Sequence, residues 1–457
     1  MTMAALREYS AMVGLVGWMT ATVALAETPR PFSPPPPSDV TAFRHATLID
    51  TRSGKTSPGM TVVVTGETIS DVEPDAAFDK APIKARIVDL TGSWIMPGLI
   101  DSHVHLATPP DRVEAEMILR RDLFGGVTNV RDMADDLRAV GDLARAARIG
   151  EIPGPDIDYA ALMAGPDFFS DPRTWAVSHG ATPGATPWMQ AITPLTDMPL
   201  AVALARGTSA TAIKIYANLD GQAVARITSE AHRQHLKVWA HAAVFPAAPE
   251  QVIAAGVDGI SHVCYLAYQV SDRVPDSYQH RVPVAFDRLA KDDNPVMQRL
   301  FDRLHSRGVV LDATLRVYLE DDRRALAHPG GRPQLCTGDL AARLINQAWR
   351  AGVAISTGTD GVATAEQQWP EVHDEMFGLV EQAHLPISEV LRAATVTGAR
   401  ALGREDVLGV IAPGFLANMI IMSRNPLEDI HNIRSISTIV KRGHEFRRSE
   451  FRPEGNR

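Results

Sequence analysis

The chain of 457 residues is poor in cysteine and has no surplus of positive charge, and each shortage excludes a class of protein. Two cysteines, Cys264 and Cys336, are too few for a disulfide-rich scaffold, and they could either pair or remain separate thiols. The net charge of −9 and the lack of a basic run with interleaved aromatic residues argue against a nucleic-acid partner. The 45% of hydrophobic residues is enough for an ordinary core, at a length that suits one large barrel plus a smaller domain.

The apolar stretch over residues 12–26 is too short for a comfortable membrane span. It follows Arg7 and ends in Ala24-Leu25-Ala26, which is a cleavage pattern of exported proteins. We therefore predict that residues 1–26 are a signal peptide and that the protein is periplasmic or secreted, with no stable membrane insertion after cleavage. An uncleaved membrane anchor is the alternative. Residues 27–39 are rich in proline and predict an extended linker.

Both ends of the remaining chain are rich in short β segments separated by Gly, Ser and Pro. Residues 40–95 contain several such segments, and a similar texture returns over 405–457. We expect these two stretches to form one small β-sandwich domain built from both chain ends.

The middle of the chain, residues 96–404, alternates short apolar runs with helical stretches. This alternation predicts a parallel α/β fold, and eight strands over roughly 300 residues fit a (β/α)8 TIM barrel. A doubly wound open sheet is the alternative. The eight expected strands lie near residues 94–105, 127–130, 157–160, 212–216, 237–241, 259–263, 309–314 and 352–357.

Metal-competent side chains stand at the ends of several of these strands. His103 and His105 are two residues apart, so on a strand they point to the same face. His241 and His262 end two later strands, and Asp360 follows the last one. Each alone has an ordinary structural explanation, such as a hydrogen-bonded core histidine or a helix cap. A barrel brings all strand ends together at one face, so we predict that these five residues meet in one metal-binding active site.

Lys214 lies inside the apolar fourth strand, where a charged amine is costly unless it is paired or neutralised. Carbamylation by carbon dioxide would convert the amine to a carboxylate (N6-carboxylysine) that can bridge two metal ions. Such a metal pair lowers the pKa of a bridging water and polarises a scissile carbonyl. Asp360 would then bind one metal and accept the proton of the attacking hydroxide.

Residues 165–189 fit neither a strand nor a long helix and contain Phe168, Phe169, Trp175 and Trp188. Long loops with aromatic residues on a rigid scaffold often form binding lids, although a surface excursion that packs on itself is equally compatible.

Several motifs together resemble the amidohydrolase superfamily. The opening signature is PGLIDSHVH at 97–105, and GVTNVRD at 126–132 is similar to the second-strand segment. ATVTGARALG at 394–403 resembles the late helix, while LGVIAPG at 408–414 and NPL at 425–427 resemble the closing β segment. Within the superfamily, IKIY at 213–216 resembles the carbamylated-lysine subgroup of imidazolonepropionase-like proteins and metal-dependent Xaa-Pro or Xaa-Arg dipeptidases.

The resemblance implies a binuclear site. His103, His105 and Asp360 would hold one divalent metal ion, while His241 and His262 would hold the second. Lys214 would bridge the two ions. Zinc is the metal that we predict, although manganese, cobalt and iron also suit nitrogen and oxygen ligands. The resemblance also implies a homo-oligomer.

Some residues are expected to contact substrate. Tyr265 matches a tyrosine that polarises the substrate carbonyl in those dipeptidases, and Tyr216 and Trp175 are candidates for the binding site. Arg316, just past the seventh strand, could bind a substrate carboxylate or form a surface salt bridge. The related dipeptidases carry a Gly-His-Gly segment where residues 164–166 here read AGP, and His179 could replace that histidine. A second departure is Ala417-Asn418, where Ala-Asp is usual.

These observations predict an exported metal-dependent amidohydrolase that cleaves amide bonds of small molecules such as dipeptides or N-acyl amino acids. Hydrolysis of a cyclic amide or a lactone with the same metal pair is an alternative. Deamination is less favoured, because deaminases usually use one metal and lack the strand lysine. A non-catalytic binding protein on the same fold is the remaining alternative, because fold alone does not settle function.

Overall fold

A computed structural model describes residues 40–80, 83–291, 294–330, 333–361 and 367–453. The predicted signal peptide and proline-rich linker lie outside these residues. None of the described helices is both long enough and apolar enough to cross a membrane.

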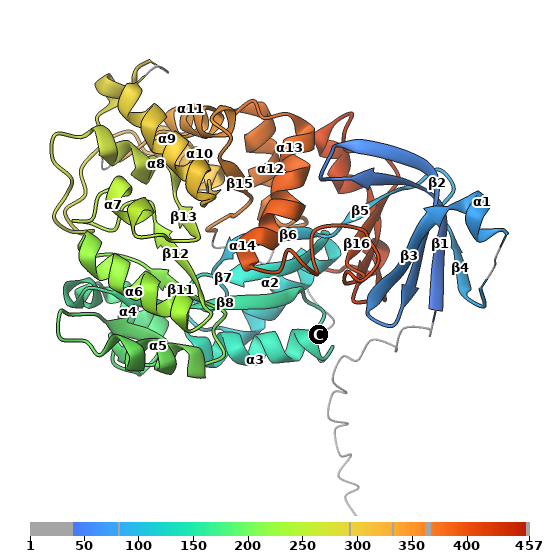
Figure 1. Cartoon of the computed structure of the whole chain (residues 1–457), viewed down its shortest axis with the longest axis horizontal. Coiled ribbons are helices and arrows are strands. Elements are labelled where there is room, and N and C mark those ends of the chain that lie inside the picture. Colours follow the sequence, from blue (N-terminus) through green and yellow to red (C-terminus); the bar gives the residue numbers. More distant parts are fainter. Residues whose placement is uncertain (1–39, 81–82, 292–293, 331–332, 362–366, 454–457) are drawn as a thin grey trace, which may run out of the picture. The chain divides into compact units, whose positions relative to one another are not determined.

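Eight parallel strands form the barrel, each paired with the next along the chain (Figure 1). This sequential order confirms the predicted (β/α)8 barrel and contradicts a doubly wound sheet. The strands are β6 (Leu99–Val104), β7 (Val127–Asp132), β8 (Asp156–Ala164), β11 (Ala212–Ile215), β12 (Lys237–His241), β13 (Gly259–Ser261), β14 (Val310–Asp312) and β15 (Ala354–Ser356).

The barrel closes between its last and first strands through the segment that follows β15. The Ser102 backbone N–H donates to the carbonyl oxygen of Thr357 at 2.9 Å, and the Ser102 hydroxyl donates to the same oxygen at 2.7 Å. Asp360 N–H then donates to the carbonyl oxygen of His103 at 2.9 Å. The seam of the barrel therefore runs directly beside the predicted metal ligands.

The helices around the barrel begin at polar residues that satisfy the free N–H groups of the first turn. Asp111, Asp136, Asp220, Asn294 and Thr337 all accept such bonds with their side chains. The larger helices are α2 (Arg112–Phe124), α3 (Leu137–Arg148), α5 (Met198–Gly207), α6 (Gly221–Arg233), α9 (Pro295–Arg307), α10 (Leu315–Ala327), α11 (Gly338–Arg350) and α12 (Glu371–Glu381). Shorter ones are α7 (Pro249–Ala254), α8 (Val263–Leu266), α13 (Ile387–Arg392) and α14 (Gly398–Leu402).

Both chain ends build one small β domain, as predicted. Its strands form a single hydrogen-bonded sheet in the order β18-β17-β16-β5-β1-β2-β3, with β4 branching from β1. Phe43, Val62, Ile95, Met419 and Val440 belong to one apolar cluster, so both halves of the sheet cover a common core. The strands are β1 (Val40–Asp50), β2 (Lys55–Thr65), β3 (Thr68–Pro74), β4 (Arg86–Asp89), β5 (Trp94–Pro97), β16 (Met419–Met422), β17 (Ile436–Lys441) and β18 (His444–Arg447), with the short helix α1 (Asp75–Phe78) after β3.

Polar contacts attach the β domain to the N-terminal ends of barrel strands. Arg442 Nε donates to Asp156 Oδ2 at 2.6 Å, at the first residue of β8. The Asn418 side-chain amide donates to Asn129 Oδ1 at 2.9 Å and its oxygen accepts from Arg442 N–H at 2.8 Å. An aspartate at position 418 could not donate the bond to Asn129, so the unusual Asn418 has a local structural role.

The two cysteines, left open by the sequence, form a disulfide between Cys264 and Cys336 with a Cα–Cα distance of 6.2 Å. The bond joins α8, just after β13, to the segment that precedes α11.

The segment after β8 is more regular than the sequence suggests. It contains a 3-10 turn (Pro166–Ser170), α4 (Pro172–Ser178), β9 (Ala185–Thr186) and β10 (Met189–Ala191). β10 pairs in parallel with β8, so the excursion is tied to the barrel wall.

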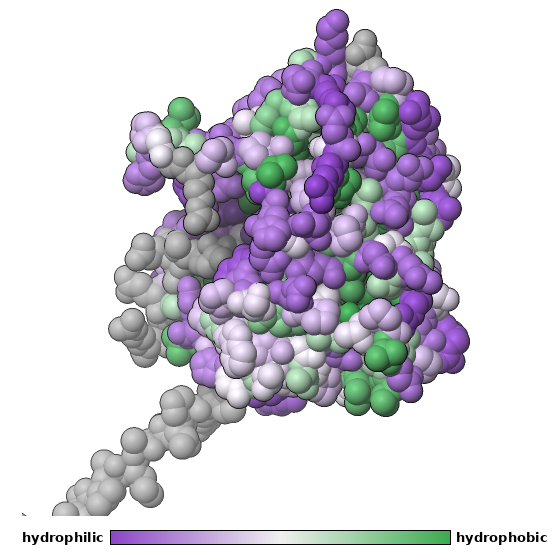
Figure 2. Space-filling model, turned by 90° about the vertical axis from the view of Figure 1, so that its left-hand side faces the viewer, coloured by the Kyte–Doolittle hydropathy of each residue, from purple (hydrophilic) through white to green (hydrophobic). Residues whose placement is uncertain are grey.

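On the face drawn in Figure 2, apolar residues of the described chain occur in small patches separated by hydrophilic ones. Such scattered exposure is ordinary for a globular protein and gives this face no single large apolar surface.

Gly165, at the end of β8, sits where a side chain cannot fit. A Cβ atom there would lie 1.9 Å from the backbone oxygen of Asn218. Because that neighbour is backbone, we expect Gly165→Ala to lower the free energy of unfolding by about 1–3 kcal/mol, measured by urea denaturation. Gly207→Ala is the matched control, since nothing lies within 4 Å of its Cβ position, and it should be neutral or slightly stabilising. Equal midpoints for both variants would contradict this close approach.

Candidate metal centre

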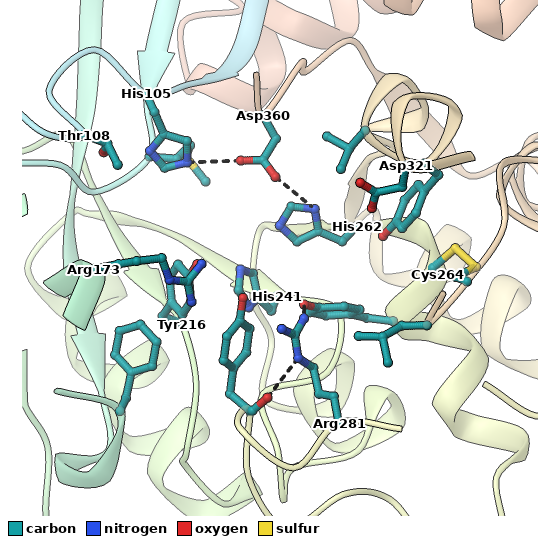
Figure 3. Close-up of a pocket in the computed structure, with 18 of the residues that line it drawn as sticks. His105, Thr108, Arg173, Tyr216, His241, His262, Cys264, Arg281, Asp321 and Asp360 are labelled. Atoms are coloured by element: carbon teal, nitrogen blue, oxygen red, sulfur yellow. Dashed lines mark hydrogen bonds and ion pairs between the residues drawn. A yellow bond between two sulfur atoms is a disulfide. The ribbon is translucent and has the colours of Figure 1, made fainter. Parts of the chain in front are cut away.

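The C-terminal ends of the barrel strands open into a cavity of about 730 Å³. Figure 3 shows His105, His241, His262 and Asp360 facing one another in this cavity, although they come from four different strand ends. The fold therefore brings these four residues together at one end of the barrel.

His103 and His105 present the same ring nitrogen to the centre. His103 Nδ1 lies 2.6 Å from Asp312 Oδ2, and His105 Nδ1 lies 2.7 Å from Asp135 Oδ1. A carboxylate on Nδ1 fixes the ring and leaves Nε2 as the electron-pair donor, which is the usual support of a metal-ligating histidine. Both Nε2 atoms lie near Asp360 Oδ1, at 3.2 Å and 3.1 Å, where each donates a hydrogen bond when protonated and would bind a metal ion when deprotonated.

Asp360 is the carboxylate that the histidines share. Its second oxygen lies 3.7 Å from Nδ1 of His262, and that nitrogen is also 3.0 Å from the hydroxyl of Thr314. Burial alone would raise the pKa of Asp360, but the charge of His103 and the hydrogen bonds from His103 and His105 outweigh it. They hold this pKa well below its ordinary range, so the carboxylate is ionised at neutral pH.

Three of these residues adopt a backbone conformation that is uncommon outside glycine. The φ angles are 71° at His262, 49° at Thr314 and 45° at Asp360. Such conformations persist where the surrounding structure holds them in place, and they cluster at functional sites.

Lys214 and His241 form the deeper side of the centre. Lys214 is 1% exposed, and its Nζ donates to Ser261 Oγ at 3.2 Å, with no carboxylate in ion-pair contact among the described residues. Burial lowers the pKa of Lys214 to about 8, against the opposing charges of Asp312 and Asp360. Burial and the nearby Lys214 hold the pKa of His241 well below its ordinary value. Nδ1 of His241 is buried and has no hydrogen-bond partner within the described part of the chain.

The donor set fits a divalent cation. One ligand atom each from His103, His262 and Asp360 lie within 4.8 Å of one another, which is close enough for a single ion. The unpartnered nitrogen of His241 and the amine of Lys214 are the kinds of buried group that a ligand would satisfy. A second ion and the carboxylation of Lys214 stay predictions.

Two predicted tyrosines line the cavity beside the histidines. The Tyr216 ring centroid lies 4.2 Å from that of His241, and the Tyr265 centroid lies 5.4 Å from those of both His241 and His262. Burial and the neighbouring Tyr278 raise the pKa of Tyr265 well above its ordinary value, so its hydroxyl keeps its proton at neutral pH.

Three other residues expected to contact substrate do not line this cavity. The side chain of Trp175 is on the outer face of α4 and is 56% exposed, while Thr174 and Val177 of the same helix line the cavity. His179 ends α4 at the surface with a φ of 41°. Arg316 donates to Glu371 at 3.1 Å in a largely buried ion pair, which occupies its charge. Arg316 thus forms a salt bridge, the alternative that the sequence left open for it, and the substrate contacts of Trp175 and His179 stay predictions.

The sequence interpretation also missed residues that shape the site. Asp312 ends β14 as the predicted ligands end their strands, so its position was a detectable signal. Asp135 follows β7 by only a few residues, and its carboxylate also accepts from the backbone N–H of Ala107 at 2.6 Å. Tyr278 and Arg281 lie in an irregular segment where no motif marks them.

Residues 94–445 match the family model described as "Amidohydrolase family". The chain belongs to the amidohydrolase family. This match includes the whole barrel and every predicted metal ligand. This is the family that the sequence motifs resemble.

Curated sequence relatives of the chain include deaminases. It is 28% identical to an adenine deaminase of Rubrobacter xylanophilus over 149 residues, which is 29% of this chain and 24% of that protein. The chain thus spans about a quarter of that relative's length. It is 22% identical to 5-methylthioadenosine/S-adenosylhomocysteine deaminase 1 of Syntrophus aciditrophicus over 382 residues, which is 80% of this chain and 79% of that protein.

Solved structures with the same fold include hydrolases of other kinds. A Xaa-Pro dipeptidase with methionine bound in the active site superposes with a TM-score of 0.69 and 21% identity, covering 89% of this chain and 100% of the other. The ochratoxinase of A. niger gives a TM-score of 0.69 and 20% identity, covering 92% and 98%. At these identities the likeness establishes the fold.

The metal centre can be tested by metal analysis of the purified protein. We expect about two divalent ions per chain by mass spectrometry, and we expect His103→Ala to lose most of this metal because it removes a donor from the shared cluster. His280→Ala, at an exposed histidine paired with Asp276, is the control and should keep the wild-type content. Metal retained in full by His103→Ala would show that the ion binds elsewhere.

Proposed function

We propose that this member of the amidohydrolase family is a metal-dependent hydrolase of amide bonds in small substrates such as dipeptides or N-acyl amino acids. The observation that carries the proposal is the buried amine of Lys214, set among His103, His241, His262 and Asp360 without a carboxylate partner in the described chain. A homo-oligomer stays a prediction.

The low pKa of Lys214, about 8, supports its proposed carboxylation. Near neutral pH a larger share of this amine is unprotonated than of an ordinary lysine. The neutral nitrogen can attack carbon dioxide, lose one N–H proton and become a carbamate anion. This change replaces a costly buried cation with an anionic metal ligand.

When bound, the metal ions would supply an acidified water and polarise the substrate carbonyl. The residues of the chain supply the rest of the chemistry. Asp360, ionised and held by His103 and His105, accepts the proton of the attacking water at its free oxygen and passes it to the leaving nitrogen. Tyr265 keeps its proton and can donate a hydrogen bond to the carbonyl oxygen as negative charge develops there.

The size of the cavity supports a small organic substrate. About 730 Å³ lies within the range of pockets that enclose drug-sized ligands, and it exceeds what a minimal dipeptide fills. The structural likeness to a Xaa-Pro dipeptidase and to ochratoxinase agrees with an amide substrate.

Deamination is the second candidate, because the curated relatives include deaminases. Both reactions use a nucleophilic water at a metal and a carboxylate that moves protons. They differ in the product, since deamination releases ammonia from an amino-substituted ring.

Turnover on a panel of dipeptides, N-acyl amino acids, lactones and aminopurines separates these reactions. We expect amide cleavage in the wild type and a loss of at least about 100-fold in kcat/KM for Lys214→Ala, because the bridging ligand is removed. Lys237→Ala is the control, since this half-exposed lysine at the start of β12 pairs with Asp258, and its turnover should stay within about twofold. Ammonia release from aminopurines alone, or unchanged turnover in Lys214→Ala, would overturn the proposal.

We also propose that the protein is exported. The apolar stretch and Ala24-Leu25-Ala26 support this location, and so does the Cys264–Cys336 disulfide, because structural disulfides persist in oxidising compartments.

Expression of the full chain in a Gram-negative host tests export. We expect the periplasmic fraction to contain a product that begins at Glu27 by N-terminal sequencing. Ala24→Arg and Ala26→Arg together should block this cleavage, because the site requires small residues. A full-length product that stays in the cytoplasm would contradict the prediction.

A further inference from the structure

Arg281 lies in the cavity wall between β13 and α9, in the segment that sequence motifs leave unmarked. Its guanidinium carbon is 3.6 Å from the centroid of the Tyr278 ring. Nε donates to the carbonyl oxygen of Tyr278 at 2.9 Å, and Nη1 donates to the hydroxyl of Tyr265. These contacts hold the guanidinium in one orientation.

The positive charge of Arg281 has no carboxylate partner among the described residues, and Nη2 has no acceptor there. Arg173, another arginine that lines the cavity, differs in this respect. Its guanidinium is paired with Asp171, with Nη2 2.6 Å from Oδ2. A half-buried cation that faces a cavity without a counter-ion favours an anionic ligand, because removing a charge from water is costly unless it is paired.

Arg281 lies close to the predicted metal ligands, separated from them by Tyr265. Tyr265, which accepts from Arg281, has its ring 5.4 Å from the rings of His241 and His262. Figure 3 shows Arg281 on the same side of the cavity as His241. The side chain of Tyr265 thus links Arg281 to these two histidines, and an anion bound at Nη2 would lie near the predicted metal ligands.

We propose that Arg281 binds a carboxylate of the substrate, on the carbon that carries the scissile amide nitrogen, and so selects N-acyl amino acids and dipeptides with a free α-carboxylate. This inference rests on the proposed amide hydrolysis. A planar carboxylate suits the guanidinium fork, and a fixed anion next to the reacting bond positions the carbonyl for attack.

Acetate release from N-acetyl-L-phenylalanine and from N-acetyl-L-phenylalaninamide tests the selection. We expect the wild type to favour the acid by at least about 30-fold in kcat/KM. Arg281→Gln should lower kcat/KM for the acid by about 100-fold, mostly through KM, and for the amide by at most about tenfold, because Tyr265 also loses the hydrogen bond from Arg281. Arg281→Lys, which keeps the charge without the fork, should retain part of the preference.

Arg173→Gln is the matched control, because it removes a guanidinium from the same cavity whose charge Asp171 already neutralises. The preference for the acid should persist in this variant. No preference in the wild type, or an equal loss on both compounds in Arg281→Gln, would overturn the role of Arg281.

Calorimetry separates this inference from the proposed function. If the wild type cleaves neither compound, both become inert ligands of the metal-loaded protein. The acid should still bind at least about tenfold more tightly than the carboxamide, and Arg281→Gln should abolish the difference. Equal binding of the two compounds by the wild type would overturn the inference, whichever reaction the enzyme catalyses.

Discussion

The carboxylate of Asp360 is the interaction on which the site depends. One of its oxygens lies 3.1–3.2 Å from Nε2 of His103 in β6 and of His105 just after it, and the other faces His262. Its backbone N–H meanwhile donates to the carbonyl oxygen of His103, at the seam that closes the barrel. The contact that completes the fold and the contact that gathers the donor atoms are therefore made by the same residue. A barrel that failed to close would also lose its binding centre.

The regular parts of the molecule could be predicted from the sequence because their signals are periodic. Short apolar runs marked all eight barrel strands, and His103, His105, Lys214 and the later ligands stood out as polar groups within or just after those runs. The side chains of Trp175 and Arg316 lie outside the cavity for local reasons. Helix α4 turns Thr174 and Val177 inward, three residues apart, and thereby turns Trp175 outward. Glu371, far along the chain, takes up the charge of Arg316. Arg281 could not be predicted, because an irregular segment has no periodicity that assigns a direction to its side chains.

The family match includes both the centre and the walls of the cavity, but the two are built from different parts of the barrel. Deaminases, a dipeptidase and ochratoxinase share similarity with this chain, and the strand ends that carry the donor atoms belong to the part that matches the family. The walls come from connecting segments, chiefly the excursion after β8 and the stretch between β13 and α9. In barrels of this kind the loops vary more than the strands, so we expect the wall residues to decide which substrate is bound.

The disulfide has a consequence for how the finished cavity arises. Cys264 stands between His262 and Tyr265, and its partner Cys336 lines the cavity beside it. The bond therefore ties the loop that carries a donor histidine and a tyrosine to the segment before α11. In a reducing compartment only non-covalent packing would join these two walls. An exported chain, as we propose, would form this covalent link only after leaving the reducing cytoplasm, so its pocket would be completed away from the place of synthesis.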